Sequence, residues 1–169
     1  MLKTFLKILD RLSPPRPIYA HCDIPCGIYD PHAAQVAAHT VIRMTNIINE
    51  LKASSANPPF EERKKIISQI ARLTKVKEEH AEIVKHEVRV IWGDYFRPEH
   101  LEKHPNLHSL VFEIMKLASK ARQEINLEAS QQLLAKVQEF AEIFFKTKGF
   151  EPIIIKTVYP TEGKIVVNK

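Results

Sequence analysis

Apolar residues recur at helical spacing in four separate segments of the chain, and this pattern constrains the fold more than any other feature. The four stripes run over residues 33–51, 66–91, 107–121 and 133–144. Within each stripe the apolar side chains fall three or four positions apart, which places them on one face of an α-helix. Polar or proline-bearing segments near 54–60, 96–105 and 123–127 separate the stripes. Four such helices pack most simply as an antiparallel four-helix bundle, so we predict an all-α fold over residues 21–148.

The C-terminal segment, residues 149–169, has a different pattern. Two β-branched runs, Ile153–Ile155 and Ile165–Val167, flank the turn-forming sequence Pro160-Thr161-Glu162-Gly163. This order predicts a β-hairpin. A single hairpin is marginally stable alone, so we expect it to pack on the bundle or on another subunit.

Composition limits the class of protein. The chain has 169 residues, which is one ordinary domain, and 44% of them are apolar. The net charge of +5 comes without a long basic run or an aromatic-arginine cluster, so nucleic acid is not an expected partner. No segment approaches the roughly 20 apolar residues of a membrane span.

Residues 1–20 are distinct from the rest of the chain. A short amphipathic helix pattern ends at Ser13-Pro14-Pro15-Arg16-Pro17, and Lys7 and Asp10 interrupt the apolar run that a secretory signal requires. We therefore predict a cleaved leader that ends at Ala20 and a cytoplasmic protein. The alternative is an N-terminal helix that packs on the body or lies on a membrane surface.

The segment that follows the leader contains the chain's two cysteines, in the order His21-Cys22-x-x-x-Cys26. Structural zinc sites require four side-chain ligands, and this segment offers three. Cleavage after Ala20 would add the α-amine of His21, and a strongly binding metal can deprotonate the Cys22 amide. Amine, amide and two sulfurs form a square plane that suits nickel(II) or copper(II), with the His21 imidazole as an axial ligand. The residue types alone leave other interpretations open: a disulfide, buried free thiols, or a generic zinc or redox site.

Two blocks of sequence carry a specific resemblance. Residues 21–31, HCDIPCGIYDP, resemble the mature N-terminus of nickel superoxide dismutases, H-C-D-x-P-C-G-x-Y-D-P. Residues 90–108, VIWGDYFRPEHLEKHPNLH, are similar to the second signature region of that family. The resemblance extends from His21 to about Lys148.

The resemblance implies a homo-oligomer, a hexamer in the family, whose leader is removed by a peptidase. It implies that superoxide is converted to oxygen and hydrogen peroxide by Ni(II)/Ni(III) cycling. His21, Cys22 and Cys26 would be the metal ligands and, with Tyr29, the catalytic residues. One alternative is a nickel carrier or store that uses the same hook, residues 21–30, without turnover. Another is a structural bundle with a Cys22–Cys26 disulfide.

Several further residues are expected around the metal. Asp23 is expected to fix the hook through backbone amides, and Tyr29 to overhang the open face, or simply to pack. Tyr95 is similar to a family tyrosine near the site, although a role in the core is an equal interpretation. Arg97 and Lys103 are candidates for guiding the anionic substrate.

The chain departs from the family pattern at two positions. Ala37 stands where the family has a glutamate that holds the axial imidazole, and His80 stands where it has an arginine. Since His80 precedes Val84 by four residues on the core-facing stripe, we predict that it accepts the His21 ring proton. The alternative is that His80 is a packed core histidine.

Overall fold

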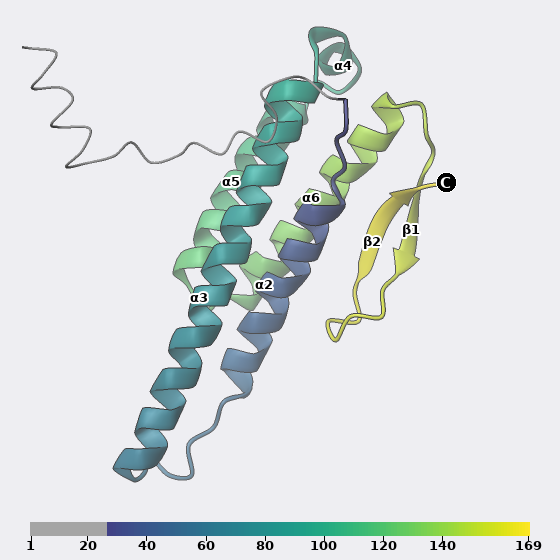
Figure 1. Cartoon of the computed structure of the whole chain (residues 1–169). Coiled ribbons are helices and arrows are strands. Elements are labelled where there is room, and N and C mark those ends of the chain that lie inside the picture. Colours follow the sequence, from purple (N-terminus) through teal and green to yellow (C-terminus); the bar gives the residue numbers. More distant parts are fainter. Residues whose placement is uncertain (1–26) are drawn as a thin grey trace, which may run out of the picture.

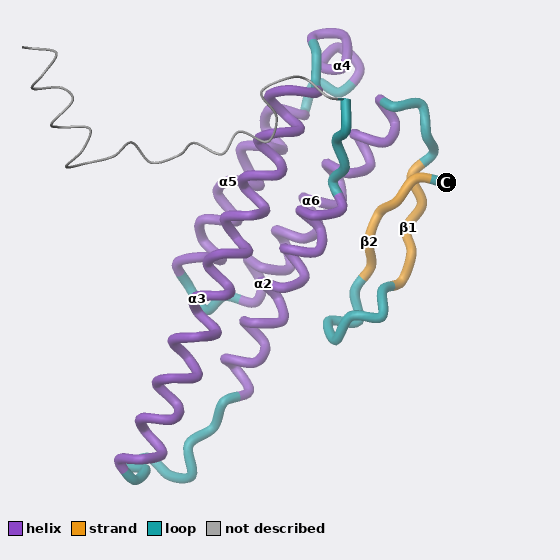
Figure 2. The backbone as a smooth tube through the Cα atoms, in the orientation of Figure 1, coloured by secondary structure: helices purple, strands orange, loops and turns teal. Residues whose placement is uncertain are grey.

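The computed structural model describes residues 27–169, which form a helical bundle with a β-hairpin along one side (Figure 1, Figure 2). Within these residues the long helices are α2 (His32–Glu50), α3 (Phe60–Val90), α5 (Leu107–Gln123) and α6 (Leu127–Thr147). A π-helical turn, η1 (Ile91–Tyr95), and a short helix, α4 (Pro98–Lys103), connect α3 to α5. Strands β1 (Pro152–Lys156) and β2 (Lys164–Asn168) complete the chain. This order confirms the predicted four-helix bundle and the C-terminal hairpin.

Side chains pair with backbone groups at the ends of several helices. The Asp30 carboxylate accepts a hydrogen bond of 2.7 Å from the His32 N–H, where α2 begins. At the start of α6, the Asn126 side chain accepts a 2.9 Å hydrogen bond from the Ala129 N–H. The Lys77 ammonium donates to three carbonyls at the C-terminal end of α5, those of Ala121, Arg122 and Glu124. These bonds satisfy helix-end groups that would otherwise be unpaired.

The core lies between the four long helices, with small side chains on one side and large side chains on the other. Helix α2 contributes three buried alanines, and α6 contributes three buried phenylalanines; the buried residues of these two helices include Ala34, Ala37, Ala38, Val41, Leu133, Val137, Phe140, Phe144 and Phe145. Small side chains on α2 leave room for the large rings of α6, which keeps the interior closely packed. Ala37, the position at which the resemblance implies a glutamate, is 2% exposed and belongs to this apolar core.

The hairpin packs on the bundle, as expected for a two-stranded sheet. The strands are antiparallel, with Ile154 opposite Val166, and β2 lies between β1 and the bundle (Figure 1). Gln35, buried in α2, donates from its amide to the Val166 carbonyl at 2.9 Å and accepts from the Val166 N–H at 2.7 Å. The neighbouring ring of His39 lies so close to Gly163 that an added Cβ there would be 2.3 Å from its Cε1 atom. Glycine is therefore required at position 163 for the turn to approach α2.

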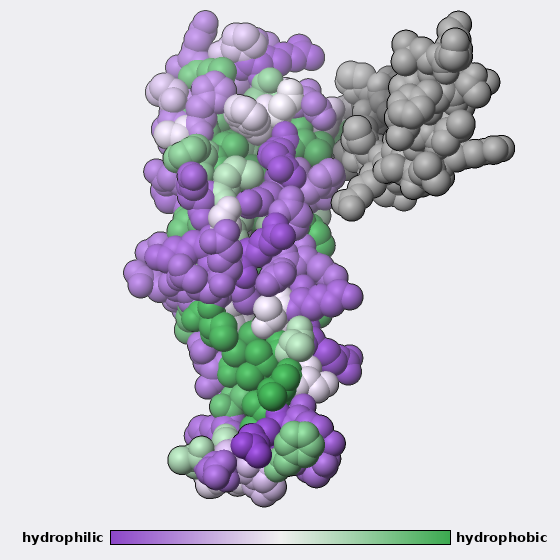
Figure 3. Space-filling view, turned by 90° about the vertical axis from the view of Figure 1, so that its left-hand side faces the viewer, coloured by the Kyte–Doolittle hydropathy of each residue, from purple (hydrophilic) through white to green (hydrophobic). Residues whose placement is uncertain are grey.

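Apolar surface remains where α2 and α3 extend beyond α5 and α6. Figure 3 views the molecule from the side of α3 and α5 and shows hydrophobic residues gathered toward that end. On α3, Phe60 is 64% exposed and Ile67 is 66% exposed. A surface pocket of about 290 Å³ there is lined by Ile47, Leu51, Gln69, Arg72 and Leu73. No helix within residues 27–169 has the length and hydropathy needed to cross a membrane.

Candidate functional site

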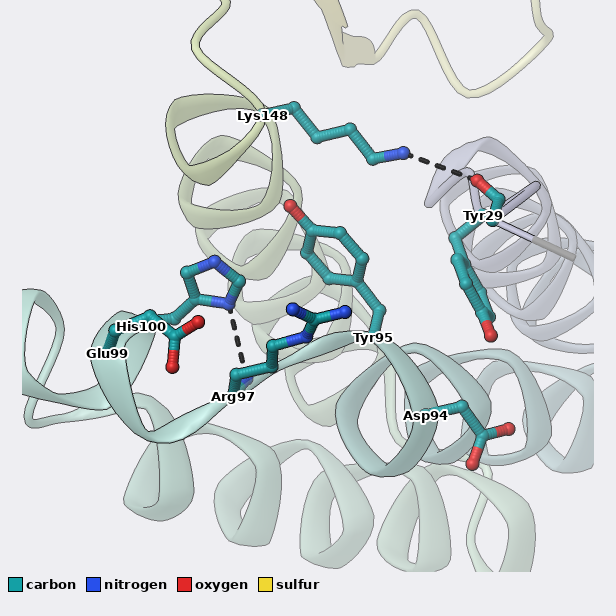
Figure 4. A pocket seen from close by; sticks show the side chains of 8 residues that line it. Tyr29, Asp94, Tyr95, Arg97, Glu99, His100 and Lys148 are labelled. Carbon is teal, nitrogen blue, oxygen red and sulfur yellow. Dashed lines mark hydrogen bonds between the residues drawn. The ribbon is translucent and has the colours of Figure 1, made fainter. Parts of the chain in front are cut away.

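The described chain begins at Gly27, which lines a pocket at one end of the bundle. Figure 4 shows this pocket from close by. The pocket has a volume of about 350 Å³ and is lined by residues from the N-terminal segment, η1, α4 and the end of α6: Gly27, Tyr29, Asp94, Tyr95, Arg97, Glu99, His100 and Lys148. Gly27 has a φ of 74°, which favours glycine because the left-handed region strains residues with a Cβ. The local backbone of the hook at this position therefore depends on this glycine.

The structure describes only part of the predicted hook, from Gly27 onward. His21, Cys22, Asp23 and Cys26 lie outside the described residues, as does the predicted leader, residues 1–20. Tyr29 lies inside it and lines the pocket. Cys26 is bonded to Gly27, so the cysteine-bearing segment joins the described chain at the pocket rim. Across residues 27–169, no group of three or more His, Cys, Asp or Glu residues is placed to hold a metal ion.

Tyr29 and Tyr95 lie together at the pocket, with ring centroids 5.8 Å apart. Tyr95 also packs against Phe144 of α6, at 4.9 Å between centroids. Its hydroxyl lies 3.0 Å from the Thr147 hydroxyl, which itself donates to the Phe144 carbonyl at 2.7 Å. The Tyr95 hydroxyl must therefore donate to Thr147. Tyr95 therefore packs against the core and also lines the pocket, whereas its expected place near the metal stays a prediction.

Lys148 is a pocket residue that the sequence did not single out. It follows α6, and its ammonium donates to the Gly27 carbonyl at 3.5 Å. The same ammonium lies 5.1 Å from the centre of the Tyr95 ring and 5.4 Å from that of Phe144. Cation–π contacts of this kind hold a lysine in place while it remains accessible. Lys148 therefore links the end of α6 to the base of the hook.

Charges of both signs line the pocket. Arg97 and Lys148 are opposed by Asp94 and Glu99, and Figure 4 shows these side chains around the same opening. Arg97 thus lies where a guiding residue was expected, whereas Lys103, the other candidate, is not among the lining residues. The positive and negative charges of these four side chains are equal in number. Any guidance of an anion must therefore depend on which charges lie nearest its path.

His80 is half-buried on α3, and one of its two ring nitrogens already has a hydrogen-bond partner. Its Nδ1 atom lies 2.8 Å from the Val76 carbonyl. A carbonyl only accepts hydrogen bonds, so Nδ1 carries the proton and Nε2 of the neutral ring is an acceptor. Glu82, two residues further along α3, pairs with Arg89 and Arg122, each at 3.1 Å. The predicted contact between His80 and His21 stays a prediction, because His21 lies outside the described residues.

Comparisons with known proteins agree over most of the chain. The family model described as nickel-containing superoxide dismutase matches residues 16–148. The relatives named "Superoxide dismutase [Ni]" from Streptomyces coelicolor and from Streptomyces seoulensis are each 37% identical over 142 residues, which is 83% of this chain and 98% of the relative.

Solved structures give the same result. A native nickel superoxide dismutase has 35% sequence identity and a TM-score of 0.64, with 76% of this chain and 99% of that chain covered. A structure with nickel ligation of the oxidised state has 33% identity and a TM-score of 0.66, with the same coverage. The family match ends at residue 148, so β1 and β2 lie beyond it.

Proposed function

The chain belongs to the nickel-containing superoxide dismutase family, and from this premise we propose how its own residues support the reaction. It is a nickel-dependent superoxide dismutase, an oxidoreductase that converts two superoxide ions and two protons to oxygen and hydrogen peroxide. We propose that His21, Cys22 and Cys26 are the nickel ligands and that Tyr29 acts beside them.

The donor set of the hook fits nickel. Two thiolates, the amide nitrogen of Cys22 and an amine at His21 form a mixed nitrogen and sulfur set of the kind that nickel(II) prefers. When bound there, nickel supplies one-electron oxidation and one-electron reduction of superoxide in alternation. The junction of Cys26 with Gly27 is the observation that carries this assignment, because it connects the donors to a pocket that Gly27, Tyr29 and Tyr95 line together.

The residues around the pocket support the hook from the protein side. Lys148 holds the Gly27 carbonyl, and the Tyr95 ring packs beside Tyr29. We propose that Tyr29 orders water or admits the small anion at the metal, and that Asp23 stiffens the hook by accepting backbone hydrogen bonds. Reduction of superoxide to peroxide consumes protons, and ordered water at this opening would deliver them.

Removal of the leader is part of this proposal. Before cleavage, the His21 nitrogen is an amide and a poor metal donor; after cleavage by a peptidase behind Ala20 it is an amine. The proposal is tested by measuring intact mass, nickel content and dismutation of the protein before and after removal of residues 1–20. We expect turnover in the processed protein alone. Full activity in a protein whose mass still includes Met1 would refute the assignment of the amine.

We further propose that the enzyme is a cytoplasmic homo-oligomer. Lys7 and Asp10, which interrupt the apolar run of the leader, support the location. The exposed apolar side chains of α3, Phe60 and Ile67, support association, since large exposed apolar patches mark interaction surfaces. The resemblance favours a hexamer, and sedimentation equilibrium of the processed protein measures the subunit number.

A further inference from the structure

Each strand of the C-terminal hairpin has one outer edge, and the two outer edges differ in whether their backbone groups have hydrogen-bond partners. The outer edge of β2 is occupied by side chains of the bundle. Gln35 bonds to both the N–H and the C=O of Val166, as described above. The Lys164 carbonyl accepts hydrogen bonds from His39 at 3.0 Å and from Gln138 at 2.5 Å. The bundle therefore provides partners for this edge in place of another strand.

The backbone groups that β1 presents outward follow from its pairing with β2. Hydrogen bonds of 3.0 Å join the Thr157 N–H to the Gly163 carbonyl, and the Lys169 N–H to the Glu151 carbonyl. In an antiparallel pair, alternate residues direct both backbone groups to the partner strand. With the observed one-to-one register, the residues that point away from β2 are Pro152, Ile154 and Lys156.

This outer edge of β1 is open and apolar. In the described part of the chain, no side chain or backbone group forms a hydrogen bond with the outward groups of β1. The three consecutive isoleucines are exposed to 36%, 58% and 41% at Ile153, Ile154 and Ile155. An exposed strand edge with apolar side chains is a template for another strand. Figure 1 shows β1 on the side of the hairpin away from the helices, so the bundle does not obstruct an approach.

The pattern of outward groups is complementary to itself. If two copies of β1 run antiparallel about a twofold axis at Ile154, each Ile154 N–H meets the Ile154 carbonyl of the other copy. Each Lys156 N–H then meets a Pro152 carbonyl. Pro152 has no N–H, so the Lys156 carbonyl gains no backbone donor in this pairing, and the proline at the strand end limits the pairing to this short segment. The two Lys156 ammonium groups lie at opposite ends of the paired strands, which avoids repulsion.

We propose that β1 pairs with β1 of a second copy of this chain, about a twofold axis at Ile154. The result is a four-stranded sheet in the order β2-β1-β1-β2, in which the bundles seal both outer edges. The bundles cover these outer edges at Lys164 and Val166, which obstructs further strands and closes the assembly. This contact lies beyond the family match and does not depend on nickel or on the proposed function.

Cysteine cross-linking tests the register directly. In the proposed pairing, the two Cα atoms at position 154 are about 5.5 Å apart, within the range that a disulfide spans. We expect Ile154→Cys to form a disulfide-linked dimer on mild oxidation, identified by peptide mapping as a 154–154 link. Ile153→Cys and Ile155→Cys are matched controls with similar exposure. Their equivalent positions are offset along the strands by two residues, roughly 8 Å apart, which is too far for a disulfide.

A proline variant tests the hydrogen bonds. The Ile154 N–H points away from β2, so Ile154→Pro removes a bond of the proposed dimer and none of the hairpin ladder. We expect sedimentation equilibrium to show at least a twofold fall in assembled mass for Ile154→Pro, whereas Ile154→Thr, which keeps the N–H, retains the wild-type mass. Cross-linking at 153 or 155 but not at 154 would overturn the proposal. So would a monomeric wild-type chain, or equal masses for wild type and Ile154→Pro together with no 154–154 link.

Discussion

The side-chain amide of Gln35 pairs with both backbone groups of Val166, across 131 residues of sequence. One side chain on α2 thereby acts as a short strand beside β2. Gln35 is fully buried and Val166 is 1% exposed, so neither group has water as a substitute partner. This pair is the main polar attachment of the hairpin to the bundle, with His39 and Gln138 on the neighbouring carbonyl.

The first prediction concerns this attachment. Gln35→Leu leaves the Val166 N–H and C=O buried without partners, at a cost of about 1–3 kcal/mol for each unsatisfied group. We expect chemical denaturation to show a loss of stability of that order, and amide exchange to show faster exchange at Val166. Gln132→Leu, at an exposed position of α6, is the control and should have little effect. Unchanged protection at Val166 in Gln35→Leu would contradict the assigned role.

The second prediction concerns pH. Burial lowers the pKa of His39 below its ordinary value, and the hydrogen bond to the Lys164 carbonyl only partly opposes this. The unfolded chain therefore binds the proton more readily than the folded chain does. The stability linked to neutral His39 should be present above the unfolded pKa of about 6.5 and be lost as the pH falls through it toward the folded value. Urea unfolding between pH 7.5 and 5 measures this slope, and His39→Gln should flatten it. Equal slopes in the two proteins would rule out His39 as the titrating group.

The third prediction concerns the thiolates. Cys22→Ser and Cys26→Ser should each reduce dismutation to background, because a hydroxyl is not ionised at neutral pH and is a harder donor than a thiolate. Packing of the helices stabilises the fold, so helical circular dichroism should match the parent. Nickel content, turnover and far-ultraviolet spectra check the three parts of this expectation. A collapse of helical signal in either variant would show that the metal site contributes to folding.

The fourth prediction concerns His80, which stands where the resemblance implies an arginine. If its Nε2 atom accepts the His21 ring proton, His80→Gln should lower turnover by about 10–100-fold, as loss of such supporting contacts often does. Nickel content should stay near that of the parent, while the electron paramagnetic resonance signal of the oxidised centre changes. His86→Gln, on the same helix, is the control. With signal and rate both unchanged in His80→Gln, His80 is a packed residue of α3 only.

The fifth prediction separates the two candidate guiding residues. Arg97 lines the pocket and Lys103 does not, so Arg97→Glu should lower the second-order rate with superoxide more than Lys103→Glu does. The two variants change the net charge equally, and they differ only in where that change lies. Stopped-flow rates at several ionic strengths test this, because salt screens the attraction. Equal effects of both variants would show that net charge, and not the position of Arg97, sets the rate.

Local pattern was sufficient to predict the elements of the fold. Each apolar stripe became a long helix because the spacing of its side chains leaves one face to bury, as at Val84 and Val88 of α3. The β-branched runs around Pro160–Gly163 became the hairpin for an equally local reason. The donor types of the hook, with the family resemblance, identified nickel chemistry before any contact was known.

Contacts between distant segments were decided only by the tertiary structure. Lysine side chains normally lie at the protein surface, yet Lys77 is 1% exposed. Its ammonium donates hydrogen bonds to carbonyls at the end of α5. Lys148 reaches Gly27 because α6 ends beside the start of the described chain, and no spacing along the sequence indicates this. Periodicity specifies which face of a helix is buried but not which helix covers it or at what height. Those choices depend on how the side chains of all four helices fit together, and they place Gln35 opposite Val166 and leave the edge of β1 open.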